Sequence, residues 1–272
     1  MSMYINPGYA GFKTARAGKY IDKSGLIAVI NDTIGKKEKL RCISRARRFG
    51  KSMAAQMLCA YYDKSVDSAF LFDDLEIAAH PSYKEHLNQY NVLYLDITTF
   101  IGQAGGVDKS LKYMIDQVVE ELNEAYPDIK GSELFPLLDK VVEKTGCQFI
   151  AIIDEWDAII RDSKTTADLQ KEYLEFLRSL FKSSASTDKI FAAAYMTGIL
   201  PIKKDGSQSA ISEFREYTML NPDKFEKYVG FTEDEVRKLC DEGNVSFDQM
   251  KRWYDGYSFE NVHSVYNPNT VM

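Results

Sequence analysis

Two short apolar runs, far apart in the sequence, constrain this chain more than any other feature. Leu40–Ser44 precedes the turn Gly50-Lys51-Ser52, and Phe149–Ile153 leads into Asp154-Glu155. A Gly-Lys-Ser turn between a strand and a helix directs backbone N–H groups and an ammonium group at phosphates. An acidic pair at the tip of a neighbouring strand supplies one carboxylate for Mg²⁺ and another for the attacking water. In this order, the two halves predict a nucleoside-triphosphate site.

The turn departs from the standard phosphate-loop pattern GxxxxGK[ST], which places a glycine five residues before Gly50. This sequence has Arg45 there, although the first glycine normally eases a tight turn. The rest of the turn keeps its chemistry, because Lys51 can reach β- and γ-phosphates and the Ser52 hydroxyl can bind Mg²⁺. For the loop alone, the alternative is a surface turn with a basic cluster. The acidic strand favours the phosphate-binding interpretation.

Strand-like apolar runs alternate with helix-length amphipathic stretches, which predicts a mainly parallel sheet covered by helices. We expect five strands, at residues 40–44, 91–97, 148–153, 190–196 and 216–220. We expect helices at residues 51–62, 107–122 and 169–181. The fold class is therefore α/β, a three-layer P-loop NTPase sandwich. The fourth strand is expected between the first and the third, with Thr197 at its tip facing the γ-phosphate; the alternative for Thr197 is a cap at the strand end.

Several stretches carry a resemblance to a known family. They are the loop Arg45 to Ser52 (R-x-R-R-F-G-K-S), Asp154-Glu155-Trp156-Asp157, Thr197-Gly198, Trp253-Tyr254-Asp255-Gly256-Tyr257 and Tyr266-Asn267-Pro268. The sequence resembles the bacterial predicted AAA-ATPase family, AAA-ATPase-like P-loop proteins that commonly carry a PD-(D/E)XK nuclease-like domain at the C-terminus. Arginine at position 45 is usual in that family, whereas Trp156 stands where tyrosine is common. The chain stops at Met272, which leaves no room for a nuclease domain.

The resemblance implies an ATP-binding protein of AAA-like type that uses Mg²⁺ and hydrolyses ATP slowly to ADP and phosphate. Glu155 would orient and deprotonate the attacking water, while Ser52 and Asp154 would hold Mg²⁺. Nucleotide contacts are expected along the loop, from Arg45, Arg47, Arg48, Phe49, Gly50, Lys51, Ser52 and Met53. The arginine finger stays open between Arg45, Arg47, Arg48, Arg161 and an arginine of a neighbouring subunit, with Arg48 preferred for a contact within the chain. ATP is favoured over GTP by the resemblance and by the lack of an Asn-Lys-x-Asp motif.

We expect three regions. Residues 1–35 form an N-terminal element beside the nucleotide, in which Tyr20 or Ile21 contacts the base or simply packs. Residues 36–220 form the ATPase core. Residues 221–272 form a helical lid, indicated by a capping box at Thr232 to Glu235. Its aromatic end, with Trp253, Tyr254 and Tyr257, stacks on a base or packs in the lid core. We expect this lid to be truncated, so that deleting residues after about 258 would change nucleotide binding little.

Composition sets limits on the remaining function classes. A formal net charge of −6 gives no support to nucleic-acid binding by the chain as a whole. The four cysteines form no CxxC pair, and neither a signal peptide nor a membrane span is recognisable, so a reduced cytoplasmic protein is expected. A homo-oligomer and a nuclease-like domain in a longer chain are the expected partners besides ATP. The competing hypothesis is a nucleotide-dependent switch or interaction module with little hydrolysis.

Overall fold

The computed structural model describes residues 2–182, 184–202, 211, 213–253 and 264–271. Its centre is a sheet of five strands in the order β2-β3-β4-β1-β5, and every neighbouring pair runs parallel. The strands are β1 (Leu40–Ser44), β2 (Asn91–Asp96), β3 (Phe149–Asp154), β4 (Phe191–Gly198) and β5 (Arg215–Tyr217). The predicted α/β class and five-stranded parallel sheet are confirmed. The fifth strand is shorter and begins one residue earlier than expected.

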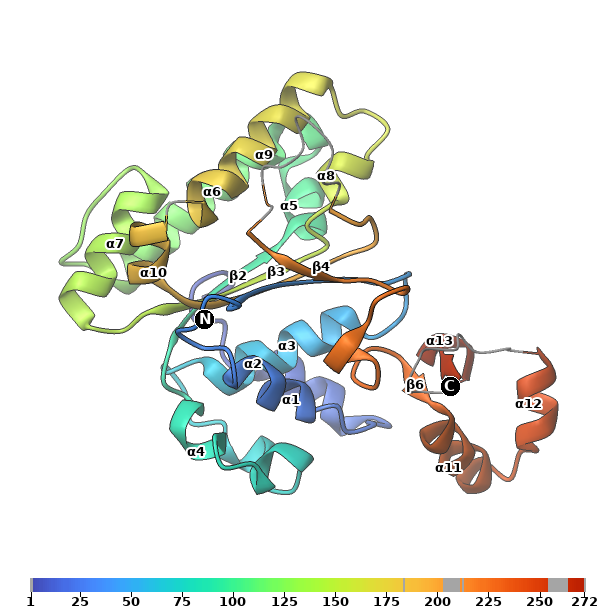
Figure 1. The fold of residues 1–272 in the computed structure, drawn as a ribbon. Coiled ribbons are helices and arrows are strands. Elements are labelled where there is room, and N and C mark those ends of the chain that lie inside the picture. Colours follow the sequence, from blue (N-terminus) through green and yellow to red (C-terminus); the bar gives the residue numbers. More distant parts are fainter. Residues whose placement is uncertain (1, 183, 203–210, 212, 254–263, 272) are drawn as a thin grey trace.

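Helices cover both faces of this sheet (Figure 1). One face carries α5 (Ile97–Ala104), α6 (Val107–Ala125), α7 (Leu134–Thr145), α8 (Ala158–Arg161), α9 (Ala167–Phe181) and α10 (Ser184–Ile190). The other face carries α1 (Ala10–Ala17), α2 (Gly25–Asn31), α3 (Lys51–Tyr62) and α4 (Tyr83–His86), together with the 3₁₀ turns η1 (Ala69–Leu71) and η2 (Glu76–Ala79). In the described part of the chain, no helix has the length and apolar character that crossing a bilayer requires.

Side chains of the central strands alternate between the two helical layers, as the pleat of a β-strand requires. Along β3, Phe149, Ala151 and Ile153 enter the core under α5 to α9, whereas Ile150 and Ile152 enter the core under α1 to α3. All six residues of β3 are buried. A strand covered on both faces reads as a continuous apolar run, which is why this strand was recognisable in the sequence.

The position of β4 brings the functional residues together. It lies between β1 and β3, so that Ser44 pairs with Gly198 and Ile153 pairs with Met196. This confirms the predicted place of the fourth strand. Because carboxyl ends of parallel strands meet at one edge, the residues that follow β1, β3 and β4 are neighbours.

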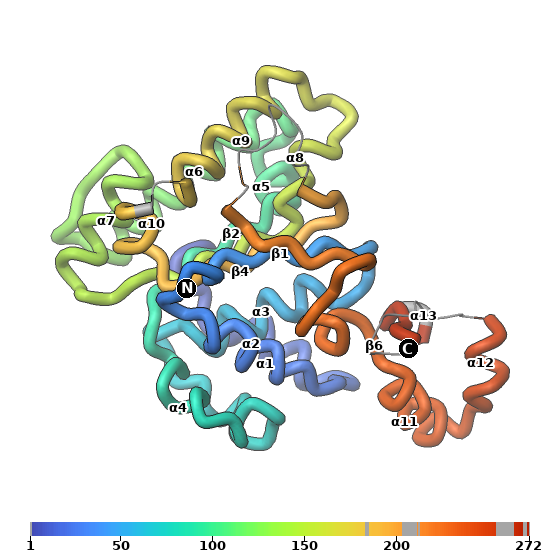
Figure 2. Tube along the Cα trace, in the orientation of Figure 1, coloured from blue at the N-terminus to red at the C-terminus, as the bar shows by residue number. Residues whose placement is uncertain are grey.

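A small lid follows the sheet and has its own apolar cluster. After η4 (Asp223–Phe225) it comprises β6 (Phe231–Thr232), α11 (Glu233–Gly243), α12 (Phe247–Trp253), β7 (Val265–Tyr266) and α13 (Pro268–Val271). Figure 2 shows α11 and α12 projecting beyond α3 at one end of the molecule. The predicted capping box is present, since Thr232 accepts from the Glu235 amide and Glu235 accepts from the Thr232 amide.

The aromatic end of α12 differs from expectation. Phe247 and Met250 pack against α11 and Tyr266, but Trp253 is 82% exposed at the last residue of the helix. The prediction that Trp253 packs in the lid core is therefore wrong, because the apolar cluster of the lid does not include this residue. Tyr254 and Tyr257 lie outside the described residues. The division into regions 1–35, 36–220 and 221–272 stays a prediction.

Candidate functional site

The loop between β1 and α3 explains how the chain does without the first glycine. Its left-handed residues are Arg48 (φ +68°) and Gly50 (φ +81°), and Gly50 is the N-cap of α3. Alternating right- and left-handed residues form a concave row of N–H groups that favours anions. Arg45 has no left-handed backbone. Glycine is therefore not required at position 45, and the loop can still turn its amides inward.

Lys51 begins α3 and points back across the mouth of this loop. Its Nζ donates to the carbonyl oxygens of Arg45 (3.1 Å) and Ala46 (2.8 Å), and the residue is 5% exposed. Burial lowers the pKa of Lys51, while the carboxylates of Glu155 and Asp154 act in the opposite direction. The ammonium group thus lies between the loop and the acidic strand.

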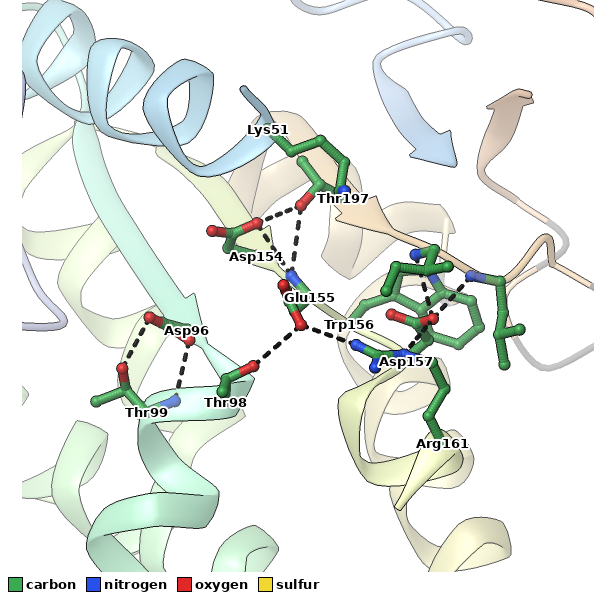
Figure 3. Close-up of polar contacts among 12 residues, drawn as sticks. Lys51, Asp96, Thr98, Thr99, Asp154, Glu155, Trp156, Asp157, Arg161 and Thr197 are labelled. Atoms are coloured by element: carbon green, nitrogen blue, oxygen red, sulfur yellow. Dashed lines mark hydrogen bonds and ion pairs between the residues drawn. The ribbon is translucent and has the colours of Figure 1, made fainter. Parts of the chain in front are cut away.

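Asp154 ends β3 and is almost fully buried. Its Oδ1 accepts from the Thr197 hydroxyl and from the backbone N–H of Glu155 (3.1 Å) (Figure 3). Burial raises the pKa of Asp154, and hydrogen bonds from the hydroxyls of Ser52 and Thr197 oppose that shift. Ser52 and Asp154, the two residues predicted to hold Mg²⁺, are therefore brought together. A buried carboxylate beside a hydroxyl is a donor set that a hard cation favours.

Glu155 is the first residue beyond β3 and adopts a left-handed backbone (φ +50°), which is uncommon for a residue with a side chain. Its carboxylate oxygen Oε2 accepts from Thr98 Oγ1 (3.2 Å) and from Arg161 Nη2 (2.8 Å). Thr98 is in place because Asp96 caps the N-terminus of α5 by accepting from the Thr99 amide (3.0 Å). The turn of the backbone at Glu155 thus aims its side chain at α5 and α8.

Asp157 completes the D-E-W-D stretch and fixes the surroundings of Glu155. It is fully buried, and its Oδ2 accepts from the amides of Ile199 (3.2 Å) and Leu200 (2.7 Å) and from Arg161 Nε (2.8 Å). Asp157 therefore ties the turn after β4 to the helix after β3. The sequence interpretation gave Asp157 no role, although the motif that carried the resemblance contained it.

Trp156 explains the glycine that follows Thr197. The indole is 4% exposed, and a Cβ atom at Gly198 would lie 2.5 Å from Trp156 Nε1 and 3.0 Å from Asp157 Oδ1. Any side chain at position 198 would push Trp156 or Asp157, the two residues that flank the backbone of Glu155 on its C-terminal side. The absence of a side chain at Gly198 thus leaves the space that Trp156 and Asp157 occupy.

An apolar pocket opens next to the loop, on the side of α3. Its walls come from three distant segments, the N-terminal element, the loop with α3, and the lid, and include Tyr20, Ile21, Phe49, Met53, Phe231 and Pro268. The residues predicted to lie beside a base, Tyr20 and Ile21, are both in this wall. So are Phe49, Gly50 and Met53 from the loop and α3.

The arginines predicted around the loop lie in different places. Arg47 and Arg48 are exposed, whereas Arg45 is 1% exposed and its guanidinium donates to the Tyr217 carbonyl (3.5 Å). Burial lowers the pKa of Arg45 to about 10, against the opposing charges of Tyr195 and Glu226. The backbone carbonyl of Arg45 faces the loop and accepts from Lys51. Arg161, the fourth candidate finger, bonds to Glu155 and Asp157.

The end of the lid also contacts the loop. The Asn267 side-chain amide donates to the Arg47 carbonyl (3.3 Å), and Val265 belongs to the same buried cluster as Phe49. Pro268 lines the apolar pocket. The antiparallel pairing of β6 with β7 returns the chain to the loop. The effect of deleting residues after about 258 on nucleotide binding stays a prediction.

Comparisons with known proteins give matches to most of the chain. The family described as Predicted AAA-ATPase matches residues 8–207. A curated protein of Azotobacter chroococcum mcd 1, named as an uncharacterized protein in the vnfD 5′ region, is 22% identical over 240 residues. That match covers 85% of this chain and 44% of the relative, so this chain spans less than half the length of that protein.

Two solved structures are similar to this chain at low sequence identity. The ORC2 protein of Aeropyrum pernix, solved as ADPNP–ADP complexes, is 13% identical with a TM-score of 0.44, over 81% of this chain and 50% of that one. PCH-2 of C. elegans is 11% identical with a TM-score of 0.35, over 90% of this chain and 46% of that one.

Proposed function

The chain belongs to the predicted AAA-ATPase family, and on that premise we propose that it binds ATP with Mg²⁺ and hydrolyses it slowly to ADP and phosphate. One observation carries the proposal. The loop lysine, a buried carboxylate beside a hydroxyl, and a second carboxylate converge at one edge of the sheet, as Lys51, Asp154 with Ser52, and Glu155. Phosphoryl transfer needs this combination of cation, metal ligand and water-orienting base.

Each residue then has a stated task. Lys51 binds the β- and γ-phosphates, and the amides from Arg47 to Ser52 surround the β-phosphate. Ser52 and Asp154 hold Mg²⁺, which when bound would neutralise phosphate charge. Thr197 keeps the Asp154 carboxylate in place through its hydroxyl. Glu155 accepts the proton of the attacking water.

The apolar pocket supports a place for the base. Aromatic side chains of Tyr20, Phe49 and Phe231 line it, and a purine ring is a flat apolar surface of matching chemistry. The pocket adjoins Gly50 at the start of α3. A single nucleotide can therefore place its base in the pocket and its phosphates over the loop.

Phosphate release by the purified chain tests the proposal. We expect Mg²⁺-dependent release of phosphate from ATP that stops when EDTA removes the metal, and ATP binding measured by calorimetry. A concentration series separates a self-sufficient chain from one that assembles, because turnover per chain rises with concentration only in the second case. Absence of ATP binding in the folded chain would refute the proposal.

A nucleotide-dependent switch is the second candidate, and one contact favours it. Asn267 and Pro268 connect the lid to the loop and to the pocket, so a nucleotide at this site would change the environment of the lid. In that case ATP would bind and alter protease sensitivity of the lid, without measurable phosphate release. The same two assays therefore separate the enzyme from the switch.

A further inference from the structure

The two hydrogen bonds to the Glu155 carboxylate go to one oxygen. Thr98 Oγ1 (3.2 Å) and Arg161 Nη2 (2.8 Å) both donate to Oε2, from opposite sides (Figure 3). Within the described part of the chain, Oε1 accepts no hydrogen bond, and the side chain is 28% exposed rather than sealed in the core. The carboxylate is therefore held asymmetrically, with one oxygen anchored and the other open.

Arg161 is itself rigidly held. Its Nε donates to Asp157 Oδ2 (2.8 Å) while its Nη2 reaches Glu155, so one planar guanidinium spans two carboxylates. Asp157 cannot move away easily, because it is fully buried and accepts two backbone amides from the turn after β4. The planar guanidinium of Arg161 therefore holds the Glu155 carboxylate in a fixed orientation relative to Asp157, which the flexible ammonium group of a lysine would not do.

From this geometry we infer that Arg161 and Thr98 are positioning residues that anchor Oε2 of Glu155, and that Oε1 is the atom that accepts the water's proton. The inference rests on the proposed hydrolysis. In that step an O–H bond of water breaks and its proton passes to Oε1, the water oxygen bonds to the γ-phosphorus, and the bond from phosphorus to the bridging oxygen breaks with its electron pair leaving on ADP. Anchoring Oε2 of Glu155 fixes the direction in which Oε1 points.

The same contacts argue against Arg161 as an arginine finger for a neighbouring subunit. Its side chain is 18% exposed, and its Nε and Nη2 both donate to carboxylates of its own chain. Reaching a phosphate on another subunit would break both ion pairs and leave Asp157 without its cation. Arg161 instead acts within its own site.

Steady-state kinetics of Arg161→Ala, Arg161→Lys and Thr98→Val test the inference, with Arg237→Ala as the matched control. Arg237 also pairs with a carboxylate four residues earlier, Glu233, but lies in α11 of the lid. We expect Arg161→Ala to lower kcat at least about tenfold and to leave the ATP Kd within about twofold. The kcat of Arg161→Lys should lie between those of the parent and of Arg161→Ala, and Thr98→Val should lower kcat less than Arg161→Ala does. Added guanidinium ion should restore part of the Arg161→Ala rate. Arg237→Ala should change neither constant.

Two results would overturn the inference. One is a weaker ATP affinity with unchanged kcat in Arg161→Ala. The other is recovery of turnover when Arg161→Ala is mixed with Glu155→Gln, since a finger acting between subunits would complement in this way and a residue acting within its own site would not.

Thermal unfolding provides a readout that does not need turnover. The Tm shifts of Glu155→Ala, Arg161→Ala and the double variant should be non-additive, because each single change breaks the same pair. Additive shifts would overturn the pairing itself. If the parent chain releases no phosphate from ATP while the shifts are non-additive, the proposed hydrolysis fails and the anchoring of Glu155 stands.

Discussion

The two ends of the candidate nucleotide site are built in different ways. The phosphate end consists of residues at or just beyond the carboxyl ends of buried strands, and its polar groups are held by side-chain contacts between neighbouring strands, such as Thr197 on Asp154. The base end is an apolar pocket whose walls come from the N-terminal element, from α3 and from the lid, and one wall residue, Met53, is 42% exposed. The comparison teaches that the sheet fixes the residues proposed for the chemistry, while the pocket proposed for the base depends on the docking of the lid.

The largest effect should come from Glu155→Gln at the phosphate end. The substitution keeps the acceptor for Thr98 and Arg161 but removes the basic carboxylate, so turnover should fall ~10²–10⁴-fold while ATP binding is kept. Asp154→Asn should instead weaken the Mg²⁺-dependent part of binding, because a metal-site carboxylate is lost. Phosphate release and calorimetry with and without Mg²⁺ distinguish the two. Turnover of Glu155→Gln at the parent rate would favour the nucleotide-dependent switch over the ATPase.

Lys51→Ala should weaken ATP binding at least about tenfold, or roughly 1.4 kcal/mol, because it removes the cation aimed at the phosphates. Lys37→Ala is the matched control, since Lys37 is exposed and lies before β1, away from the loop. Because Lys51 also bonds the Arg45 and Ala46 carbonyls, circular dichroism must show that the variant is folded. Unchanged affinity in a folded Lys51→Ala chain would remove the phosphate-loop assignment.

Gly198→Ala tests how tightly the phosphate end is packed. The new Cβ would meet the Trp156 indole at 2.5 Å, and overpacking of this kind costs about 1–3 kcal/mol. Gly102→Ala is the control, because nothing lies within 4 Å of its Cβ inside α5, and alanine there should stabilise by about 0.4–1 kcal/mol. Urea unfolding measures both. Equal effects at the two glycines would mean that Trp156 does not pack on Gly198.

The base end can be separated from the phosphate end by removing residues 264–272. This deletion takes away β7, the Asn267 contact to the loop and the Pro268 wall of the pocket. We expect ATP affinity to fall about fivefold, or roughly 1 kcal/mol, because apolar contacts with the base are lost. Binding of inorganic tripolyphosphate should stay the same, since it has no base. An equal loss for both ligands would show that the tail supports the loop rather than the pocket.

The sequence was informative where a functional residue lies at the carboxyl end of a strand or just after the loop that follows it. Lys51, Asp154 and Thr197 were located in this way, and the parallel order of the strands then determined that they meet. Glu155 was recognised, but its partners Thr98 and Arg161 were not assigned, because a hydroxyl in α5 and a cation in α8 carry no pattern of their own.

Other parts needed the tertiary structure. The pocket could not be predicted, because its walls lie more than 200 residues apart between Tyr20 and Pro268. The helix α7 was not predicted, although Leu134, Leu137, Leu138 and Val141 follow the helical period and are buried against the sheet. The contact of the tail with the loop was not predicted, because the short β6–β7 pairing that returns the tail to the loop has no recognisable sequence signal.

The smallest effect should appear where the lid meets the N-terminal element. Lys23 donates to both oxygens of Glu235 (2.7 and 2.6 Å) and to the Lys227 carbonyl (2.7 Å), with 13% of its side chain exposed, whereas Lys19 pairs with Glu242 at 3.4 Å and is 46% exposed. Lys19→Ala should change the free energy of unfolding by no more than about 0.5 kcal/mol, because an exposed pair is screened by water and salt. Lys23→Ala should cost about 1–3 kcal/mol, since the partly buried Glu235 loses its cation. Urea unfolding of both variants at low and high salt makes the measurement. If Lys19→Ala costs as much as Lys23→Ala, the lid is held by its surface charges, and the base end would then be open to regulation by ionic strength alone.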